Sequence, residues 1–325
     1  MNLHAMNQIS FSSPNLFKST AVLLYALLVP ILLGGCSLGD DSSDGAMFGA
    51  DLQRTGVFPS GGPTTIDGAA WSFQTGREVA SSPAVSGGTV YVGSRDNHLY
   101  AVEAETGAER WAFEAGGLVH SSPAVSGGTV YVGSHDNHLY AIDAKTGQEQ
   151  WAFETGDDVE SSPAVAGGTV YVGSRDNHLY AIDVETGEEQ WAFETNGAVY
   201  SSPAVSGGTV YTGSYDEHLY AFDAETGEEQ WAFETDGSVR SSPAVSNGTV
   251  YVGSVIGLRK NGYLYAVDAK TGEKDWEFET GSPVGSSPAV SNGTVYVGSG
   301  GPTLVSTTTY MDSGHLYAVD AVTGR

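Results

Sequence analysis

The side chains best able to recognise a ligand stand at two places that recur along the chain. One is the residue immediately before each Ser-Ser-Pro tripeptide, and the other follows the Gly-Ser pair later in the same unit. Imidazole, guanidinium, phenol and carboxylate groups can stack or form charged hydrogen bonds, so their collection here predicts a binding surface. Functionless drift of exposed loop tips is the alternative. The candidate residues are His120, Glu160, Tyr200 and Arg240 at the first place and Arg95, His135, Arg175 and Tyr215 at the second.

Chain direction predicts that both places lie on one face of the molecule. The strand that follows each Ser-Ser-Pro start runs away from that face, a glycine-rich hairpin reverses the chain, and the next strand returns to it. Two insertions, Val255 to Asn261 and Gly301 to Ser313, fall after this second strand in neighbouring units. Insertions confined to one face of a repeat scaffold are typical of its binding surface.

A second set of histidines recurs before each Leu-Tyr pair, where a ring of imidazoles could suggest a metal site. Equivalent positions of different units are expected to lie too far apart for metal bonds of about 2 Å. We therefore interpret these histidines as turn residues that bond to the backbone, and we expect no metal site and no catalytic residue. The set comprises His98, His138, His178, His218 and His315.

The single cysteine of the chain, Cys36, lies where an exported lipoprotein carries its anchor. The apolar run Ala21 to Leu33 is too short to span a bilayer and suits the core of a signal peptide. The following Leu33-Gly34-Gly35-Cys36 resembles the lipobox of bacterial and archaeal lipoproteins; an ordinary signal-peptidase site is the alternative. We expect a signal peptide over residues 1–35, a lipid on Cys36, a flexible acidic tether over 36–46 and a lead-in segment over 47–68.

Composition predicts an all-β protein that avoids nucleic acids. Glycine is abundant at 44 residues, and short Val-, Thr- and Tyr-rich runs alternate with turn residues. Asp and Glu total 39 against 13 Lys and Arg, giving a formal net charge of −26. A surface this acidic repels phosphate backbones, so a nucleic-acid partner is not expected.

From residue 71 onward the sequence is a sixfold repeat. Each unit reads as a short Ser-Ser-Pro-Ala-Val strand, a tight hairpin, two β-branched strands and a fourth strand that carries a tryptophan. Four antiparallel strands per unit are typical of a propeller blade. In the first full unit we expect strands over Ser81 to Val85, Thr89 to Gly93, Leu99 to Ala104 and Arg110 to Glu114.

The segment Ala101 to Trp111, with the pattern A-x-[DE]-x-x-T-G-x-x-x-W, resembles the tryptophan-docking repeat of pyrroloquinoline quinone (PQQ) dehydrogenases and BamB-like assembly lipoproteins. The resemblance covers residues 69–325 and implies that each tryptophan packs against the neighbouring blade. The sequence departs from the dehydrogenases, because Cys36 cannot supply a disulfide of adjacent cysteines and no tryptophan is left to sandwich a quinone. No cofactor is therefore expected. The docking residues are Trp71, Trp111, Trp151, Trp191, Trp231 and Trp276.

The two ends of the repeat array complement each other. Ala69 to Gln74 reads as a lone fourth strand, and the last unit stops at Arg325, where its own fourth strand would begin. We therefore predict a β-propeller of six four-stranded blades, closed by pairing the N-terminal strand with the last blade, which would remove exposed sheet edges. An array that originally continued further is the alternative.

Taken together, these features predict a non-catalytic, monomeric lipoprotein that binds a protein partner of the cell envelope. Its lipid would hold it to the periplasmic side of an outer membrane in a Gram-negative host, or to the cell surface in an archaeon. Two alternatives of other classes are a protein or fragment related to PQQ-dependent dehydrogenases and a sensor of carbohydrates or other small ligands.

Overall fold

The computed structural model describes residues 51, 69–256, 261–300, 302–305, 308–311 and 314–325. The expected signal peptide, Cys36, the tether and the lead-in segment all lie outside this part apart from the single residue Asp51. Within it the protein is all-β, and none of the described residues forms a helix that could cross a membrane.

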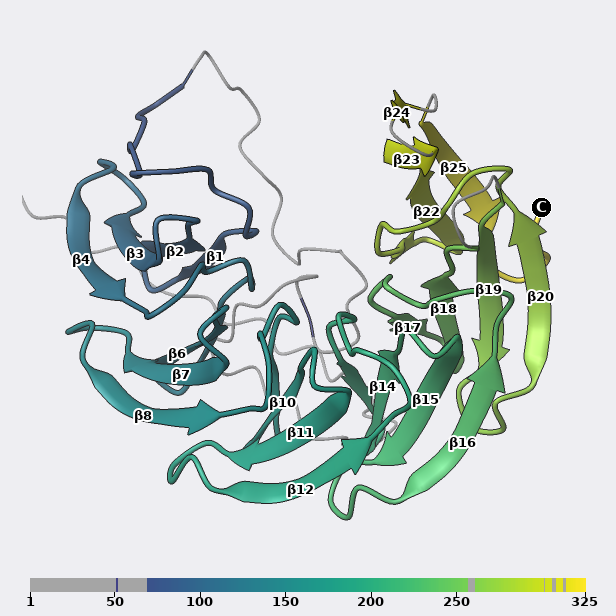
Figure 1. Ribbon diagram of the computed structural model, residues 1–325, viewed down its shortest axis with the longest axis horizontal. Helices are drawn as coiled ribbons and strands as arrows, with labels where there is room; N and C mark the ends of the chain where they lie inside the picture. Colours follow the sequence, from purple (N-terminus) through teal and green to yellow (C-terminus); the bar gives the residue numbers. More distant parts are fainter. Residues whose placement is uncertain (1–50, 52–68, 257–260, 301, 306–307, 312–313) are drawn as a thin grey trace, which may run out of the picture. The chain divides into compact units, whose positions relative to one another are not determined.

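The described chain folds into six successive antiparallel sheets, which are the blades of a β-propeller (Figure 1). Blade 1 comprises β1 (Ala84–Ser86), β2 (Thr89–Gly93), β3 (His98–Glu103) and β4 (Glu109–Glu114); blade 2 comprises β5 (Ala124–Ser126), β6 (Thr129–Gly133), β7 (His138–Asp143) and β8 (Glu149–Glu154). Blade 3 comprises β9 (Ala164–Ala166), β10 (Thr169–Gly173), β11 (His178–Asp183) and β12 (Glu189–Glu194); blade 4 comprises β13 (Ala204–Ser206), β14 (Thr209–Gly213), β15 (His218–Asp223) and β16 (Glu229–Glu234). Blade 5 comprises β17 (Ala244–Ser246), β18 (Thr249–Gly253), β19 (Tyr263–Asp268) and β20 (Lys274–Glu279); blade 6 comprises β21 (Ala289–Ser291), β22 (Thr294–Ser299) and β25 (His315–Asp320), with the hairpin of β23 (Pro302–Val305) and β24 (Thr308–Met311) between its last two strands.

Each blade follows the order expected from the repeat, with the Ser-Ser-Pro strand innermost. The first strands of neighbouring blades contact one another, while the tryptophan strands lie outermost in Figure 1. The hairpin between β1 and β2 turns at Gly87 and Gly88, whose φ angles are +53° and +72°, and the Asn247-Gly248 hairpin has the same signs. Positive φ at both central residues is the type I′ geometry that glycine and asparagine favour. The predicted tight hairpins are therefore confirmed.

The first strand is shorter than the sequence predicts. β1 begins at Ala84, because the preceding serines make hydrogen bonds outside the blade ladder. The Ser81 hydroxyl accepts a hydrogen bond from the Gly93 N–H at 2.7 Å, and the Ser82 N–H donates to the Ser122 hydroxyl of the next blade at 2.9 Å. The Ser-Ser-Pro segment thus bonds to the second strand of its own blade through Ser81 and to the next blade through Ser82, instead of extending a strand.

The hydrophobic core lies between blades. Each cluster of buried side chains combines residues of two neighbouring blades, as Leu99 and Val119 do with Val130 and Ile142. A blade therefore cannot bury its apolar face alone, which is the physical basis of cooperation between repeats.

The tryptophans sit at the outer end of these inter-blade contacts. The Trp111 indole N–H donates to the Ala144 carbonyl of the next blade at 3.0 Å, and its ring lies against Gly147. A Cβ atom at Gly147 would come within 2.7 Å of the indole, so only glycine fits this approach. The same contacts recur at Trp71, Trp151, Trp191, Trp231 and Trp276.

Residues 69–74, which the sequence predicts as the closing strand, make side-chain contacts with blade 1 but form no β-strand. Trp71 docks on blade 1 as the other tryptophans dock on their neighbours, with its N–H 2.9 Å from the Ala104 carbonyl, and Phe73 packs edge-on against Tyr100 at 5.2 Å. Residues 69–74, however, form no strand, and the sheet of blade 6 ends at β25 among the described residues. This differs from the expected closure, because blade 1 alone satisfies the aromatic side chains and their docking requires no ladder of backbone hydrogen bonds.

Candidate functional site

Backbone hydrogen bonds at the blade junctions bring the two variable positions of the repeat together. The N–H of Val119, just before His120, donates to the Ser94 carbonyl at 3.1 Å, so His120 lies next to Arg95. The His135 N–H donates to the Leu118 carbonyl at 2.9 Å, which places His135 on the other side of His120. The same two bonds recur at the following junctions. The repeat therefore aligns alternating side chains from successive blades into one row.

We call this set of side chains the junction row. It consists of the eight residues that the sequence predicts as a binding face. In an order in which each residue contacts the next, these are Arg95, His120, His135, Glu160, Arg175, Tyr200, Tyr215 and Arg240. Seven of the eight are half-buried and Arg240 is exposed. The structure brings all eight into consecutive contact; whether they bind a partner stays a prediction.

The first part of the row is a chain of charged and imidazole groups. Arg95 pairs with Glu78 at 2.7 Å and donates from Nε to His120 Nε2 at 2.7 Å. The rings of His120 and His135 then pack edge to face, with centroids 4.4 Å apart. Burial lowers the pKa of His120, and the electrostatic effects of the neighbouring His135 and Arg95 lower it further. His120 is therefore held neutral near pH 7.

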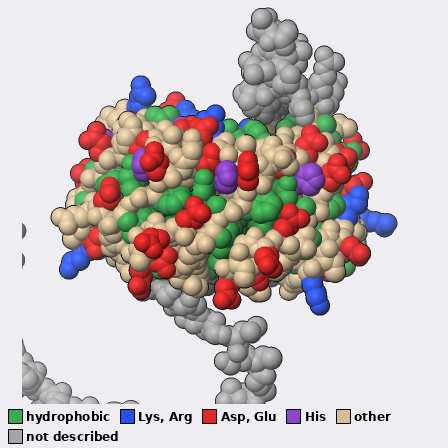
Figure 2. Space-filling view, turned by 60° about the horizontal axis from the view of Figure 1, so that its bottom comes forward, with side chains coloured by type: hydrophobic (Ala, Val, Ile, Leu, Met, Phe, Trp, Pro, Cys, Tyr) green, Lys and Arg blue, Asp and Glu red, His purple; other side chains and the backbone are tan. Residues whose placement is uncertain are grey.

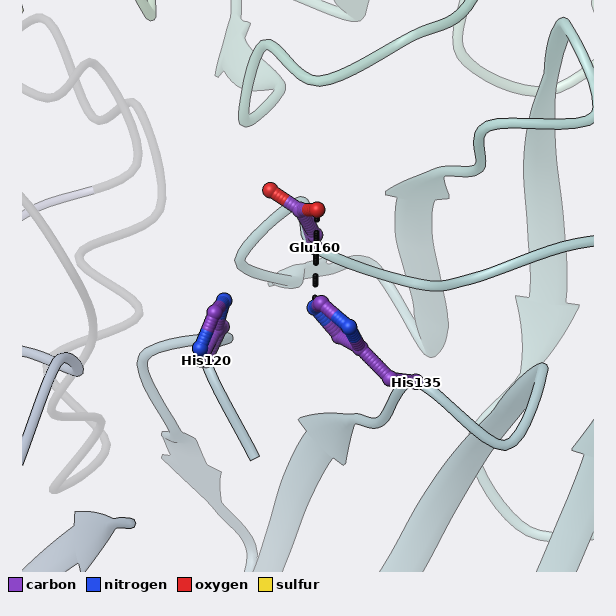
Figure 3. Close-up of side chains that lie close together, drawn as sticks. All are labelled: His120, His135 and Glu160. Carbon is purple, nitrogen blue, oxygen red and sulfur yellow. Dashed lines mark ion pairs between the residues drawn. The ribbon is translucent and has the colours of Figure 1, made fainter. Parts of the chain in front are cut away.

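The middle of the row is acidic and is partly neutralised by Arg175. His135 Nδ1 lies 3.4 Å from the Asp158 carboxylate. His135 Nε2 lies 3.5 Å from the Glu160 carboxylate (Figure 3). Arg175 pairs with Asp158 at 2.5 Å and lies 3.9 Å from the Glu160 carboxylate. The exposed fractions of the His135, Asp158 and Glu160 side chains are 16%, 18% and 25%, so water screens the two carboxylates only weakly.

The last part of the row is an aromatic pair covered by guanidinium groups. Tyr200 and Tyr215 have ring centroids 4.6 Å apart, and Arg240 lies 5.3 Å and 5.6 Å from the two rings. Arg175 approaches the Tyr200 ring at 5.7 Å. Burial raises the pKa of Tyr215, which therefore stays a neutral phenol. Among the described residues no carboxylate pairs with Arg240, so its N–H groups are available to a ligand.

Sequence reasoning missed two acidic members of this site. Glu78 and Asp158 stand two residues before the variable position at Ser-Ser-Pro, where Leu118 and Ala198 occupy the equivalent places. Variation between the units at this third position was the available signal.

A cavity of about 350 Å³ opens beside Glu78, lined by Arg77, Arg95 and Leu118.

Four of the five recurring histidines bond to the backbone of the preceding turn, as interpreted from the sequence. His98 Nδ1 lies 2.8 Å from the Asp96 carbonyl, and the equivalent distances at His138, His178 and His218 are 2.8, 3.1 and 2.9 Å. The preceding aspartate also caps the turn, since the His98 N–H and the Tyr100 hydroxyl both donate to the Asp96 carboxylate.

The surface around these blades is acidic. Figure 2 shows Asp and Glu side chains spread over the visible face, with Lys and Arg side chains few and mostly near its edges. Three of the 13 basic residues of the chain, Arg95, Arg175 and Arg240, belong to the junction row. The row is therefore a place where cationic groups gather on a protein of net charge −26.

The fold and the Trp-Gly docking contacts define a β-propeller of PQQ-like repeats. The model of one β-propeller family, described as the β-propeller of the beta-alanine-activating enzyme, matches residues 126–315. The chain belongs to this family. Residues 65–162 also match the model of the outer membrane protein assembly factor BamB.

Solved structures with the same fold include both a BamB protein and quinoprotein dehydrogenases. BamB from Moraxella catarrhalis is 22% identical with a TM-score of 0.62, over 78% of this chain and 85% of that one. A europium-containing methanol dehydrogenase is 16% identical (TM-score 0.69; 87% and 78% covered), and a quinohemoprotein alcohol dehydrogenase from Pseudomonas putida HK5 is 18% identical (0.67; 87% and 65%). At these identities the likeness is one of fold. No curated protein matches the chain.

Proposed function

We propose that this protein is a non-catalytic scaffold of the cell envelope that binds a protein partner through the junction row. The observation that carries the proposal is the row itself, in which Arg95, His120, Tyr200 and Arg240 depart from the repeat and yet lie in one continuous series of contacts. A series that crosses several blades offers an extended surface. This suits a polypeptide segment better than a small molecule, which usually occupies one concave and largely apolar pocket.

The chemistry of the row favours a partner segment that carries a carboxylate and an aromatic or arginine side chain. The Arg240 guanidinium group lies 5.3 Å and 5.6 Å from the centroids of two phenol rings, and it can form paired hydrogen bonds with a carboxylate. Tyr200 and Tyr215 offer a rigid apolar surface of the kind enriched in interface hot spots. We expect the binding energy to concentrate at this end.

The envelope location is supported by the match of residues 65–162 to the BamB model and by the lipobox resemblance at Cys36. BamB is named as an outer membrane protein assembly factor, and an anchored propeller could present the junction row to an assembly partner in the same compartment. Lipid on Cys36 is the membrane attachment that this proposal requires.

The test places a photo-crosslinking amino acid at Ser238, beside the row, in the anchored full-length protein and identifies the captured envelope protein by mass spectrometry. We expect one dominant partner, whose yield falls at least tenfold in Tyr200→Ala and in Arg240→Ala. The matched control is Arg110→Ala, which removes an exposed arginine from β4, outside the row. Equal yields in all three variants, or a loss in the control as well, would contradict the proposal.

Two further measurements separate this function from its competitors. A PQQ-dependent dehydrogenase would reduce a redox dye once PQQ and calcium are added, and we expect no reduction. A small-ligand sensor would gain thermal stability in a screen of sugars and metabolites, since a ligand that binds the native state raises apparent stability. We expect no shift that depends on Arg240.

A further inference from the structure

Three ligand-forming side chains of the junction row meet at the junctions between blades 1, 2 and 3. One atom each of His120, His135 and Glu160 lies within 4.8 Å of the others (Figure 3). His120 precedes the first strand of blade 2, His135 follows the second strand of that blade, and Glu160 precedes the first strand of blade 3. The three come from places that the repeat otherwise fills with unrelated residues, so the fold does not require them.

His135 is oriented as a metal-binding histidine would be. Its Nδ1 lies 3.4 Å from the Asp158 carboxylate, which favours the tautomer with the proton on Nδ1 and leaves the lone pair on Nε2. His135 Nε2 is buried and has no hydrogen-bond partner, although it faces Glu160 at 3.5 Å. A buried nitrogen without a partner is destabilising, and a bound cation would satisfy it.

The distances suit a tetrahedral ion of the size of zinc. Two ligand atoms bound at about 2.0–2.1 Å in a tetrahedron lie about 3.3 Å apart. The His135–Glu160 distance of 3.5 Å already meets this requirement. The third ligand lies no more than 4.8 Å away, so it must move by up to about 1.5 Å, which side-chain rotation can provide.

We propose that His120, His135 and Glu160 form a binding site for a divalent transition-metal ion, with Asp158 orienting His135. Two imidazoles and one carboxylate select zinc and similar ions over calcium and magnesium, which prefer oxygen ligands. Three protein ligands leave one coordination position for water or for a donor atom of a bound molecule. The site does not depend on the proposed partner and can be tested without it.

The surrounding charges are compatible with a cation. Arg175 is neutralised by Asp158 and Arg95 by Glu78, so the two nearby guanidinium groups are each paired with a carboxylate. The net charge of −26 concentrates cations at the surface. Arg95 must release its hydrogen bond to His120 Nε2 if that nitrogen is the ligand.

The experiment measures zinc on the purified full-length protein in detergent, carrying Cys36→Ser so that its thiol cannot bind metal. Equilibrium dialysis with elemental analysis gives the stoichiometry, and competition with a chromophoric chelator gives the affinity. We expect one zinc ion per chain, an affinity at least tenfold lower in His135→Ala and Glu160→Gln, and a 10- to 100-fold loss in Asp158→Asn. His218→Ala, which removes a histidine outside the site, is the control and is expected to bind as the parent does.

The absorption spectrum of bound cobalt provides a second readout. It would not change in the variants if His135 and Glu160 only supported the fold and did not bind the metal. Cobalt bound to two imidazoles and a carboxylate is expected to show visible absorption of a four-coordinate ion, and this absorption should disappear in His135→Ala. Circular dichroism verifies that each variant is folded. Zinc binding that is unchanged in the double variant His135→Ala/Glu160→Gln, or no zinc bound by the parent at micromolar concentration, would overturn the proposal.

Discussion

The contact between each tryptophan and the glycine of the next blade makes a quantitative prediction at Gly147. Gly147 has φ +71°, and a Cβ atom there would lie 2.7 Å from the Trp111 indole. Gly147→Ala therefore adds two penalties, one for the left-handed backbone conformation and one for the displaced ring. Gly128→Ala isolates the first penalty, because Gly128 has φ +83° and no atom lies within 4 Å of an added Cβ.

The two penalties have different sizes. A left-handed conformation costs a residue with a Cβ atom about 1–2 kcal/mol. Overpacking against a well-ordered side chain costs about 1–3 kcal/mol more. We expect Gly128→Ala to lower the free energy of unfolding by about 1–2 kcal/mol and Gly147→Ala to lower it by about 2–5 kcal/mol, so that the difference between the variants reports the fit of the indole.

Urea unfolding followed by far-ultraviolet circular dichroism measures both variants. A difference of about 2 kcal/mol moves the midpoint by about 1 M when the slope is about 2 kcal/mol per molar urea. The two slopes must agree with the slope of the parent protein, since long repeat arrays can unfold in parts. Equal midpoints for Gly147→Ala and Gly128→Ala would refute the reasoning, because they would show that the indole does not rest tightly on the glycine.

Three other changes have defined outcomes. Trp151→Phe removes the indole N–H bonded to a backbone carbonyl of the next blade, and should lower the free energy of unfolding by about 1 kcal/mol in the same urea assay. Arg95→Gln removes a cation and a competing hydrogen bond at His120, so zinc affinity should rise in the chelator assay; a weaker affinity would show that the guanidinium group orients the imidazole. Hydrogen bonds from Thr186, above all from its backbone N–H, lower the pKa of Asp183, so its stabilising effect is present above the unfolded pKa of about 3.9 and is lost as the pH falls through the lower folded value. Acid titration of Asp183→Asn should show a shallower loss of stability below pH about 4, and an unchanged slope would contradict the role of this carboxylate.

The repeat made the blades predictable, because the same local chemistry recurs in every unit. Strand β2 has the predicted bounds of Thr89 to Gly93, and the glycine hairpins follow from the requirement for positive φ. The start of the first strand was less predictable, since Ser81 and Ser82 bond to groups outside the ladder. The bond from Ser82 to Ser122 depends on the distance between blades, which no single unit encodes.

The sequence predicted which residues belong to the candidate site, but it did not predict which of them contact one another. Comparison of the units identified His120, His135 and Glu160 as departures from the repeat, and chain direction placed them on one face. Their contact depends on the bonds that cross each junction, such as that from the Val119 N–H to Ser94. The sequence alone predicts no metal ligand, and the metal site is a proposal from this geometry. The position of Asp158 beside His135 could not be predicted from the sequence.

The hydrogen bonds that hold the junction row together involve backbone atoms, as between His135 and Leu118. The side chain at each position of the junction row can therefore be replaced without loss of these backbone hydrogen bonds. Each replacement alters the chemistry at one position of the row and leaves the other positions in place. Specificity in such a protein can diversify residue by residue, as in a combinatorial library whose framework is constant. Replacing Tyr200 or Arg240 by other side chains offers a route to propellers with chosen ligands on the same blades.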